Sequence, residues 1–204
     1  MNKLPIYKTE GIILKSADWG DLDRLLTIYT RGYGKIQARA ISARKRDSKL
    51  NGLLQSFTLS QFLLAKSKTI DIITDLSVIN GYNYLHNNLE SLGYAFYFSE
   101  LIDKLITAPE RDENVWRLVA RAFEVLNDPP KVLCVAGAKG GEVCVKGENL
   151  PKIKVLFEDK LLEFLGHPTP RLRMASQPTP LQRLNYLQSL AGERINAHKF
   201  LAQI

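Results

Sequence analysis

The sequence predicts an α+β protein, with a five-stranded β-barrel at the N-terminus followed by an all-α C-terminal domain. Apolar residues alternate with polar ones over the first eighty residues, as in half-buried strands, and recur at helical spacing from about residue 82 onward. The composition, with 45% hydrophobic and 24% charged residues, is that of an ordinary soluble globular protein. A length of 204 residues suffices for two small domains, so we place the barrel at residues 1–80 and the helical domain at residues 81–204.

Five segments before Gly81 have the character of strands. They are residues 6–15, 22–30, 35–40, 55–65 and 69–79. In the third segment small apolar residues alternate with Lys35, Gln37 and Arg39, so one face is apolar and the other basic. In the fourth and fifth segments, the residues expected to face inward are Phe57 and Leu59, and Ile70, Ile72, Thr74, Leu76 and Val78, respectively. Five short strands at this spacing suit a small barrel of the OB-fold type.

The remaining elements are predicted to be helices. They are residues 84–107, 113–127, 152–165, a helix that opens at Thr179-Pro180 and runs to about 190, and residues 193–203. Pro129-Pro130 ends the second helix and Gly166 the third. Residues 131–150 are rich in glycine and contain two short β-like runs, so we expect a hairpin-like excursion or a mobile surface loop there.

The positive charge of the chain is concentrated near its N-terminus. The whole chain has 28 Lys and Arg against 21 Asp and Glu, a net charge of +7, and residues 1–80 account for +6 of it, with thirteen basic and seven acidic residues. A one-sided basic patch is typical of a protein that binds a polyanion, because each neutralised phosphate releases condensed counterions. The alternative is a solvated surface loop. The candidate contacts to a polyanion are Arg31, Lys35, Arg39, Arg44, Lys45, Arg46 and Lys49, and these become the candidate DNA contacts under the family resemblance described below.

Aromatic residues near the expected turns and strand ends are candidates for stacking on bases. They are Trp19, Tyr29 and Tyr33, and packing in the core or at the rim of the barrel is the alternative for each. The sequence shows no sign of base-edge readout, so the positive charges should give affinity with little sequence specificity.

Other chemistries find little support in the sequence. Gly137-Ala138-Lys139-Gly140-Gly141 lacks the spacing of a phosphate-binding loop, and the three histidines are scattered. The carboxylates of Asp18, Asp21 and Asp23 are better explained by turn formation and ion pairing with Arg24. We therefore predict no catalytic residue, no cofactor and no metal, although a deep pocket lined by Asp21, Asp23 and His86 would revive an enzymatic interpretation.

The compartment follows from two further observations. No apolar run approaches the roughly 20 residues of a membrane span, and the first ten residues lack the apolar core of a signal peptide. We therefore expect a cytoplasmic protein without a membrane partner, in which Cys134 and Cys144 are reduced thiols.

Several blocks of the sequence resemble the bacterial recombination mediator RecO family. The N-terminal blocks are TEGIILK at 9–15, DLDRLLTIYTR at 21–31, and Gly34-Lys35 with Ala43-Arg44-Lys45 and Ser48; weaker matches lie at 53–57, 99–105 and 157–166. The resemblance implies an OB-fold, a helical C-terminal domain and no catalytic turnover. It also implies binding and annealing of single-stranded DNA, work with RecR and single-stranded DNA-binding protein, and help in loading RecA on gapped DNA.

The sequence departs from that family in two places, one of which is the glycine-rich stretch 131–150, where the family usually has a compact helical hairpin. Many members carry a CxxC…CxxC zinc module where this chain has His167-Pro168-Thr169-Pro170-Arg171, so zinc is not predicted. The acidic C-terminal tail of single-stranded DNA-binding protein could be received by Arg117, Arg121 and Lys131, for which a solvated helix face is the alternative.

The overall expectation is a mediator of DNA repair and recombination. It would bind single- and double-stranded DNA without sequence specificity, anneal complementary strands, and help RecR load RecA onto DNA coated with single-stranded DNA-binding protein. It would associate with the nucleoid when bound to DNA. An RNA-binding OB-fold module is the alternative.

Overall fold

The computed structural model describes residues 5–107, 109–128, 131–136, 142–146, 149–169, 178–201 and 203. The chain divides into two compact units. The first comprises the chain up to Tyr82 together with Thr107–Trp116, and the second comprises Asn83–Ile106 and the chain from Arg117 onward. The segment between the second and third helices therefore belongs with the barrel. Over the described residues, none of the helices combines the length and apolar character that a membrane crossing requires.

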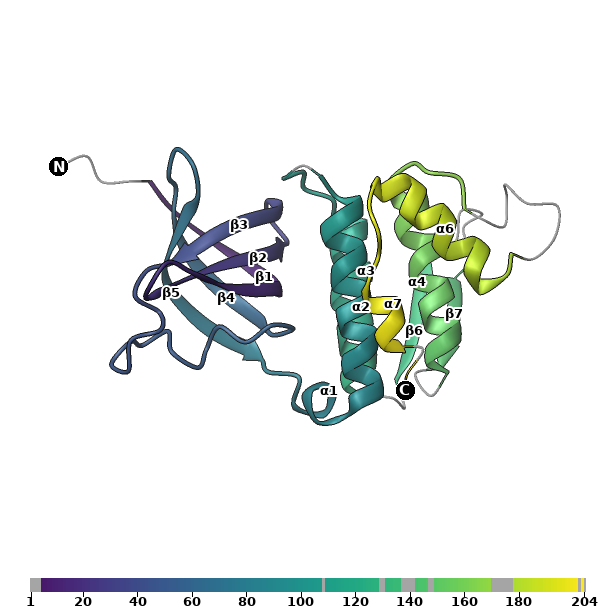
Figure 1. Cartoon of the computed structure of the whole chain (residues 1–204), viewed down its shortest axis with the longest axis horizontal. Helices are drawn as coiled ribbons and strands as arrows, with labels where there is room; N and C mark the ends of the chain where they lie inside the picture. The colour runs from purple at the N-terminus through teal and green to yellow at the C-terminus, as the bar shows by residue number, and fades with distance from the viewer. Residues whose placement is uncertain are drawn as a thin grey trace. The chain divides into compact units, whose positions relative to one another are not determined.

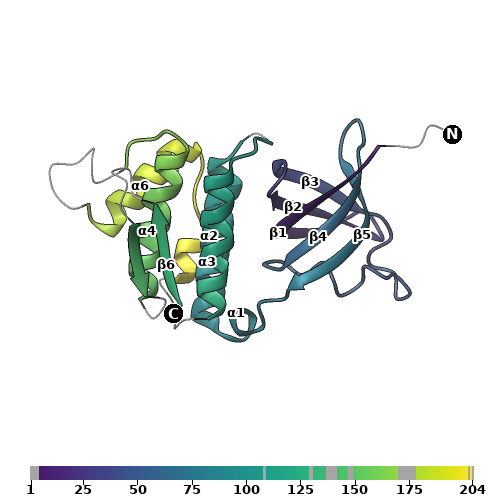
Figure 2. The ribbon, with the colours of Figure 1, turned by 180° about the vertical axis from the view of Figure 1, so that it is seen from behind.

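The first unit is a closed five-stranded barrel (Figure 1). Its strands are β1 (Ile6–Trp19), β2 (Asp23–Thr30), β3 (Gly34–Ala40), β4 (Leu59–Ala65) and β5 (Asp71–Asn80). They follow the order β1-β2-β3-β5-β4, and β1 closes the barrel by pairing with β4. All pairs are antiparallel except β3 with β5. Because β1 is long, its first half pairs with β4 and its second half with β2, which Figure 2 shows from behind. The predicted barrel is confirmed.

The barrel interior is filled by alternate residues of the strands. On β3 the predicted phase is confirmed, because Ala38 and Ala40 are fully buried and Ile36 packs against the same core. Phe62 and Leu64 of β4 are also fully buried, and side chains of this size contribute about 1.5 to 3 kcal/mol each when they leave water. The interior is thus filled by side chains, and chemistry at the barrel has to take place on its outer face or its loops.

The expected phases of β4 and β5 are partly wrong. Phe57 has a positive φ of 62° and donates its backbone N–H to the carbonyl of Ile13 at 2.6 Å, so the chain kinks before β4 begins at Leu59. The inward set of β4 is therefore Ser60, Phe62 and Leu64. In β5, Ile73 is buried while Thr74 and Val78 are exposed, because the pairing with β4 shifts register between Leu63 and Leu64.

The helices lie where the sequence places them, except that the first expected helix is divided and the last, expected from residue 193, begins at Ala197. They are α1 (Asn83–Asn87), α2 (Leu89–Leu105), α3 (Glu113–Asn127), α4 (Leu150–Phe164), α6 (Pro180–Ala191) and α7 (Ala197–Leu201). The first expected helix divides at Asn88, whose side chain caps α2 by accepting the Ser91 N–H at 2.8 Å. Thr179 caps α6 through a capping box with Gln182, and Gly192 ends that helix in the left-handed conformation.

The core of the helical unit combines stacked rings with a buried ion cluster. Phe98 of α2 stacks on Phe157 of α4 with ring centroids 4.1 Å apart. Beside them, the Glu158 carboxylate, only 2% exposed, accepts hydrogen bonds from the Tyr97 hydroxyl at 2.7 Å and from Arg183 Nε at 2.8 Å. The same guanidinium donates to Asp159 at 2.6 Å. α2, α4 and α6 are therefore joined by polar contacts as well as by apolar packing.

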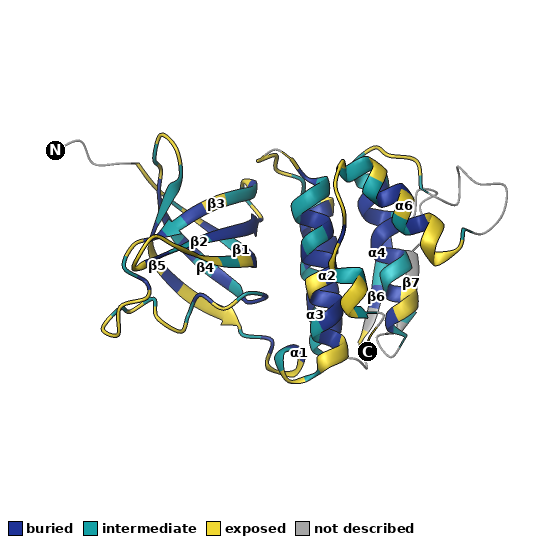
Figure 3. Cartoon of the chain, in the orientation of Figure 1, coloured by how far each residue is buried: buried dark blue, intermediate teal, exposed yellow. Residues whose placement is uncertain are grey.

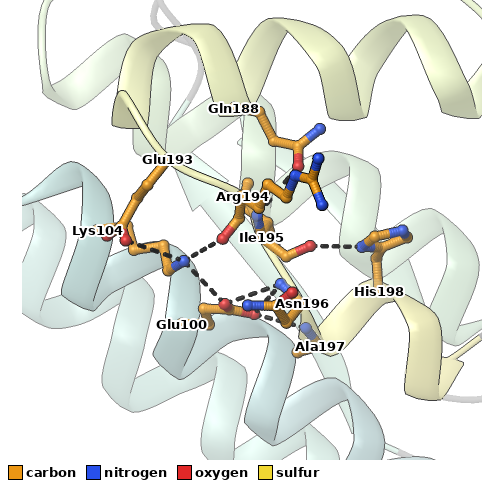
Figure 4. A network of polar contacts seen from close by, with 9 residues as sticks. All are labelled: Glu100, Lys104, Gln188, Glu193, Arg194, Ile195, Asn196, Ala197 and His198. Carbon is orange, nitrogen blue, oxygen red and sulfur yellow. Dashed lines mark hydrogen bonds and ion pairs between the residues drawn. The ribbon is translucent and has the colours of Figure 1, made fainter.

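The last described segment is held on α2 by side chains of that helix (Figure 4). The Glu100 carboxylate accepts the backbone N–H groups of Asn196 at 2.9 Å and Ala197 at 2.6 Å, at the start of α7. Lys104 pairs with Glu100 at 3.1 Å and also donates to the Arg194 carbonyl. The rings of Phe96 and Phe200 meet in a T-shaped arrangement, with centroids 6.5 Å apart.

A two-stranded antiparallel hairpin interrupts the helical unit. It consists of β6 (Val132–Ala136) and β7 (Glu142–Lys146), which confirms the expected hairpin within residues 131–150. Cys134 lies directly opposite Cys144, and the two form a disulfide. The expectation of two reduced thiols is therefore wrong for this structure, because the hairpin register brings two residues ten positions apart into contact.

Candidate nucleic-acid interface

The outer face of β3 carries the basic side chains that the sequence predicts there. Lys35, Gln37 and Arg39 point away from the buried alanines, and they pair across the sheet with Tyr29, Thr27 and Leu25 of β2. A strand rises about 3.3 Å per residue, so Lys35 and Arg39 are about 13 Å apart. The candidate cations therefore form two groups, one at each end of β3.

The first group, Arg31 and Lys35, lies at the turn between β2 and β3. Arg31 pairs with Glu10 and with Glu113, at 3.5 Å in each case. Gly34 has a positive φ of 67°, and a Cβ placed on it would collide with the backbone of Glu110. The segment that contains Glu110 and Glu113 thus covers this end of the strand and partly neutralises it.

The second group begins with two arginines that are tied to the turn between β1 and β2. The Asp23 carboxylate accepts the Ser42 backbone N–H at 2.7 Å and the Arg39 Nε–H at 2.6 Å. These hydrogen bonds, chiefly the one from Ser42, lower the pKa of Asp23. Arg44 pairs with Asp18 at 3.3 Å and donates to the Asp21 carbonyl at 3.1 Å. As expected from the sequence, the Asp18 and Asp23 carboxylates serve in turns and ion pairs, and Arg24 also pairs with Asp18 at 3.7 Å.

The loop after β3 carries further cations. It is built from successive turns, in which the carbonyls of Ser42, Lys45 and Ser48 each accept an N–H three residues later. Lys45, Arg46 and Lys49 are exposed, and within the described part of the chain no ion pair involves Arg46 or Lys49. Buried Ala43 and Leu54 anchor the two ends of the loop in the barrel core. Between them the loop is mostly exposed or intermediate, as the colouring of the segment between β3 and β4 shows (Figure 3). The loop therefore exposes positively charged side chains while its two ends are fixed to the barrel.

The three candidate stacking residues have different surroundings. Tyr29 is only 1% exposed and offers no ring face to a base, so its proposed stacking role is wrong and it is a packing residue; burial also raises its pKa. Tyr33 is 40% exposed and lies against Tyr7, with ring centroids 4.5 Å apart. Tyr7 in turn donates to Asp71 at 2.5 Å. Trp19 is 44% exposed and belongs to the opposite end of the barrel, where it pairs with Asp23.

Sequence reasoning missed two exposed apolar residues, Leu22 and Ile41, at the same end of the barrel as Trp19. Leu22 and Ile41 are both exposed, and the Leu22 carbonyl accepts the Arg44 N–H at 2.9 Å, which joins the β1–β2 turn to the loop after β3. The sequence contains these exposed apolar residues beside arginines, but only the strand order shows that they lie at one end of the barrel. We call the set Trp19, Leu22, Ile41, Arg39, Arg44, Lys45, Arg46 and Lys49 the barrel-tip patch.

The candidate tail-binding residues lie in the second unit. Arg117 is exposed on α3, and Arg121, one turn later, pairs with Glu124 at 2.8 Å. Lys131 precedes β6 and pairs with Asp128 at 3.3 Å. Among the described residues, no group of three or more His, Cys, Asp and Glu side chains is placed to hold a metal ion.

These observations define the chain as an OB-fold protein with a helical C-terminal unit, because the closed barrel has the OB-fold strand order. Comparison with known proteins narrows this class. Residues 1–82 match the family described as "Recombination protein O N terminal". The barrel is thus similar to the N-terminal domain of the RecO proteins, and the chain as a whole is similar to DNA repair proteins RecO.

The similarity extends beyond the barrel in some relatives. The chain is 32% identical over 123 residues to the DNA repair protein RecO of Pelotomaculum thermopropionicum, which is 60% of this chain and 48% of that protein. It is 32% identical over 175 residues to RecO of Dehalococcoides mccartyi, covering 85% and 61% of the two chains. With RecO of Caldicellulosiruptor saccharolyticus the identity is 31% over 163 residues, 80% and 59%. The chain spans about half the length of the curated relatives it matches.

Proposed function

We propose that this chain is a non-enzymatic mediator of DNA repair and homologous recombination that binds single- and double-stranded DNA through the barrel-tip patch. The observation that carries the proposal is the loop after β3, in which Arg46 and Lys49 are exposed, have no acidic partner among the described residues and project from a base fixed to the barrel. The names of the relatives, all DNA repair proteins RecO, support the biological setting.

The chemistry of the patch favours phosphate contact over base reading. Lysine and arginine side chains on an exposed loop neutralise phosphates, and counterion release then drives binding for any sequence. Aromatic and aliphatic side chains beside them can contact unpaired bases, again without a preference for one base. Affinity should therefore fall steeply with salt and vary little with sequence.

Annealing follows from the same charge. Two complementary strands on one basic surface repel each other less, and base pairing then supplies the specificity. By analogy with the family, we further propose that RecR and the acidic tail of single-stranded DNA-binding protein are partners, and that RecA loading is the downstream step. Arg117, Arg121 and Lys131 are the proposed tail contacts, and a pull-down with RecR and with the tail peptide tests these assignments.

The DNA proposal is tested by fluorescence anisotropy with a labelled oligo-dT across a salt series. The double variant Arg46→Ala/Lys49→Ala should lower the slope of log affinity against log salt by about 1.4, since each single-strand contact contributes about 0.7. The control Lys152→Ala/Lys199→Ala removes the same charge from exposed positions on α4 and α7 and should leave the slope unchanged. Equal slopes for the two variants would refute the assignment of the loop.

The same assay separates the proposal from the RNA-binding alternative. A structured RNA of equal length is added as competitor against bound oligo-dT. We expect it to compete no better than single-stranded DNA, and clearly stronger competition by the RNA would favour an RNA-binding module.

A further inference from the structure

The β6–β7 hairpin places its two cysteines where solvent reaches them. Side chains alternate between the faces of a strand, and Leu133 and Val135 on either side of Cys134 are buried in the helical unit. Cys134 is therefore on the opposite face, where it is half-buried, and its partner Cys144 is exposed. The disulfide lies on the outer face of the hairpin.

Apart from the disulfide, few interactions stabilise the hairpin. A two-stranded sheet is marginally stable alone, and within the described residues this one pairs with no third strand. Its packing comes from the inner face, where β7 lies beside α4, as both views show (Figures 1 and 2). The disulfide joins directly opposed residues, with Cα atoms 4.1 Å apart, so it fixes the register of the two strands.

We propose that Cys134 and Cys144 form a thiol–disulfide switch that ties the β6–β7 hairpin when oxidised and releases it when reduced by a small-molecule thiol. The function proposed above does not depend on this switch, and the switch does not depend on DNA binding. Register, accessibility and the absence of a third paired strand among the described residues carry the proposal together.

The exchange is balanced by two equivalents of the external thiol. The first thiolate attacks the exposed sulfur of Cys144, the bond to Cys134 breaks, and Cys134 leaves as a thiolate that takes up a proton. A second thiolate then attacks the mixed disulfide and releases Cys144, which is also protonated. The two cysteines gain two electrons and two protons, and the external thiol becomes its disulfide. The difference in exposure predicts that the mixed disulfide forms at Cys144.

Hydrogen exchange of the full chain in buffers of reduced and oxidised glutathione tests the switch, with the thiol state read in parallel by alkylation and mass spectrometry. For a loop of sequence separation 10, the loop-closure model predicts about a hundredfold change in the opening equilibrium. We expect amides of β6 and β7 to exchange faster in the reduced form by up to about this factor. Amides of α2 should not change.

Serine variants supply the matched controls. Cys134→Ser/Cys144→Ser should show the fast hairpin exchange in every buffer. Cys134→Ser, which keeps exposed Cys144, should be glutathionylated faster than Cys144→Ser. The proposal is overturned if wild type stays dithiol in all buffers, or if it oxidises with no change in hairpin exchange. Since none of these measurements uses DNA, failure here leaves the nucleic-acid proposal standing, and the reverse also holds.

Discussion

The guanidinium of Arg39 is clamped by the carboxylate of Asp23, which accepts its Nε–H at 2.6 Å while also holding the backbone of Ser42. The positive charge of Arg39 on the face of β3 is thus already paired. The first role of this pair is to fix the start of the cationic loop against the neighbouring turn.

The first prediction follows from that pairing. Arg39→Ala should lower the salt slope of DNA binding less than Arg46→Ala does, because Arg39 enters the complex with its charge already compensated by Asp23. Salt-dependent anisotropy on the two single variants compares them directly. If Arg39→Ala produces the larger drop, the arginine must exchange its carboxylate for a phosphate on binding, and the barrel-tip patch then centres on β3.

A second prediction uses the two tryptophans as reporters. Trp116 is 6% exposed and Trp19 is 44% exposed, so a Trp116→Phe variant should report on Trp19 alone. Stacking contributes about 1 to 3 kcal/mol per base, so Trp19→Ala should weaken oligo-dT binding by roughly fivefold to a hundredfold. In the Trp116→Phe variant, oligo-dT should quench fluorescence far more than an abasic oligonucleotide of the same length. Equal quenching by both would show that Trp19 contacts no base.

A third prediction concerns Gly34 and the segment Thr107–Trp116. Gly34→Ala should lower the free energy of unfolding by at least about 1 to 3 kcal/mol, because the position has a positive φ and the new Cβ would meet the Glu110 backbone. Gly20→Ala is the matched control, with a φ of 60° and nothing within 4 Å. Urea denaturation of both variants separates backbone strain from the collision, and similar losses would mean that Glu110 does not press on the barrel.

The buried ion cluster of the helical unit gives a fourth prediction. Arg183→Met leaves the Glu158 carboxylate buried with the Tyr97 hydroxyl and a more distant Lys154 amine, 3.8 Å away, and should cost about 3 to 5 kcal/mol of unfolding free energy. Arg121→Ala removes an ion pair whose side chains are about 40% exposed and should cost less than about 1 kcal/mol. Chemical denaturation measures both. Comparable losses would show that the cluster is not buried in solution.

The fifth prediction is a pH dependence at Glu100. Burial raises the pKa of this carboxyl, but hydrogen bonds from Asn196 and Ala197 and the pairing with Lys104 outweigh it, so the pKa is lowered. The stabilisation is therefore fully present above the ordinary value and is lost as pH falls through the lowered folded value. Hydrogen exchange of α7 in mildly to strongly acidic buffers should show it loosening below that pH. In Glu100→Gln, α7 should exchange faster at neutral pH and lose the acid step, and an unchanged acid step would exclude Glu100 as its source.

Much of this architecture can be predicted from the sequence alone, because the spacing of apolar residues and the positions of helix caps and breakers depend only on neighbouring residues. Alternation predicts the phase of β3, and Thr179-Pro180 predicts the start of α6. Which residues of β4 and β5 face the core cannot be predicted from local sequence, since it depends on a kink at Phe57 and on a register shift in strand pairing. The stacking role of Tyr29 fails for the same reason, because burial of an outward-facing ring depends on what packs over it.

The sequence by itself determined the barrel, the helices that follow and a surplus of positive charge between Arg31 and Lys49. Only the tertiary structure decided which of those charges are available. Strand order brings Asp18 and Asp23 to Arg44 and Arg39, and the segment with Glu113 to Arg31, while Arg46 and Lys49 are left without acidic partners in the described chain. It also set Cys134 opposite Cys144. The physical reason is common to both, since charge compensation and disulfide formation act over a few ångströms between residues whose distance along the chain says nothing about their distance in space.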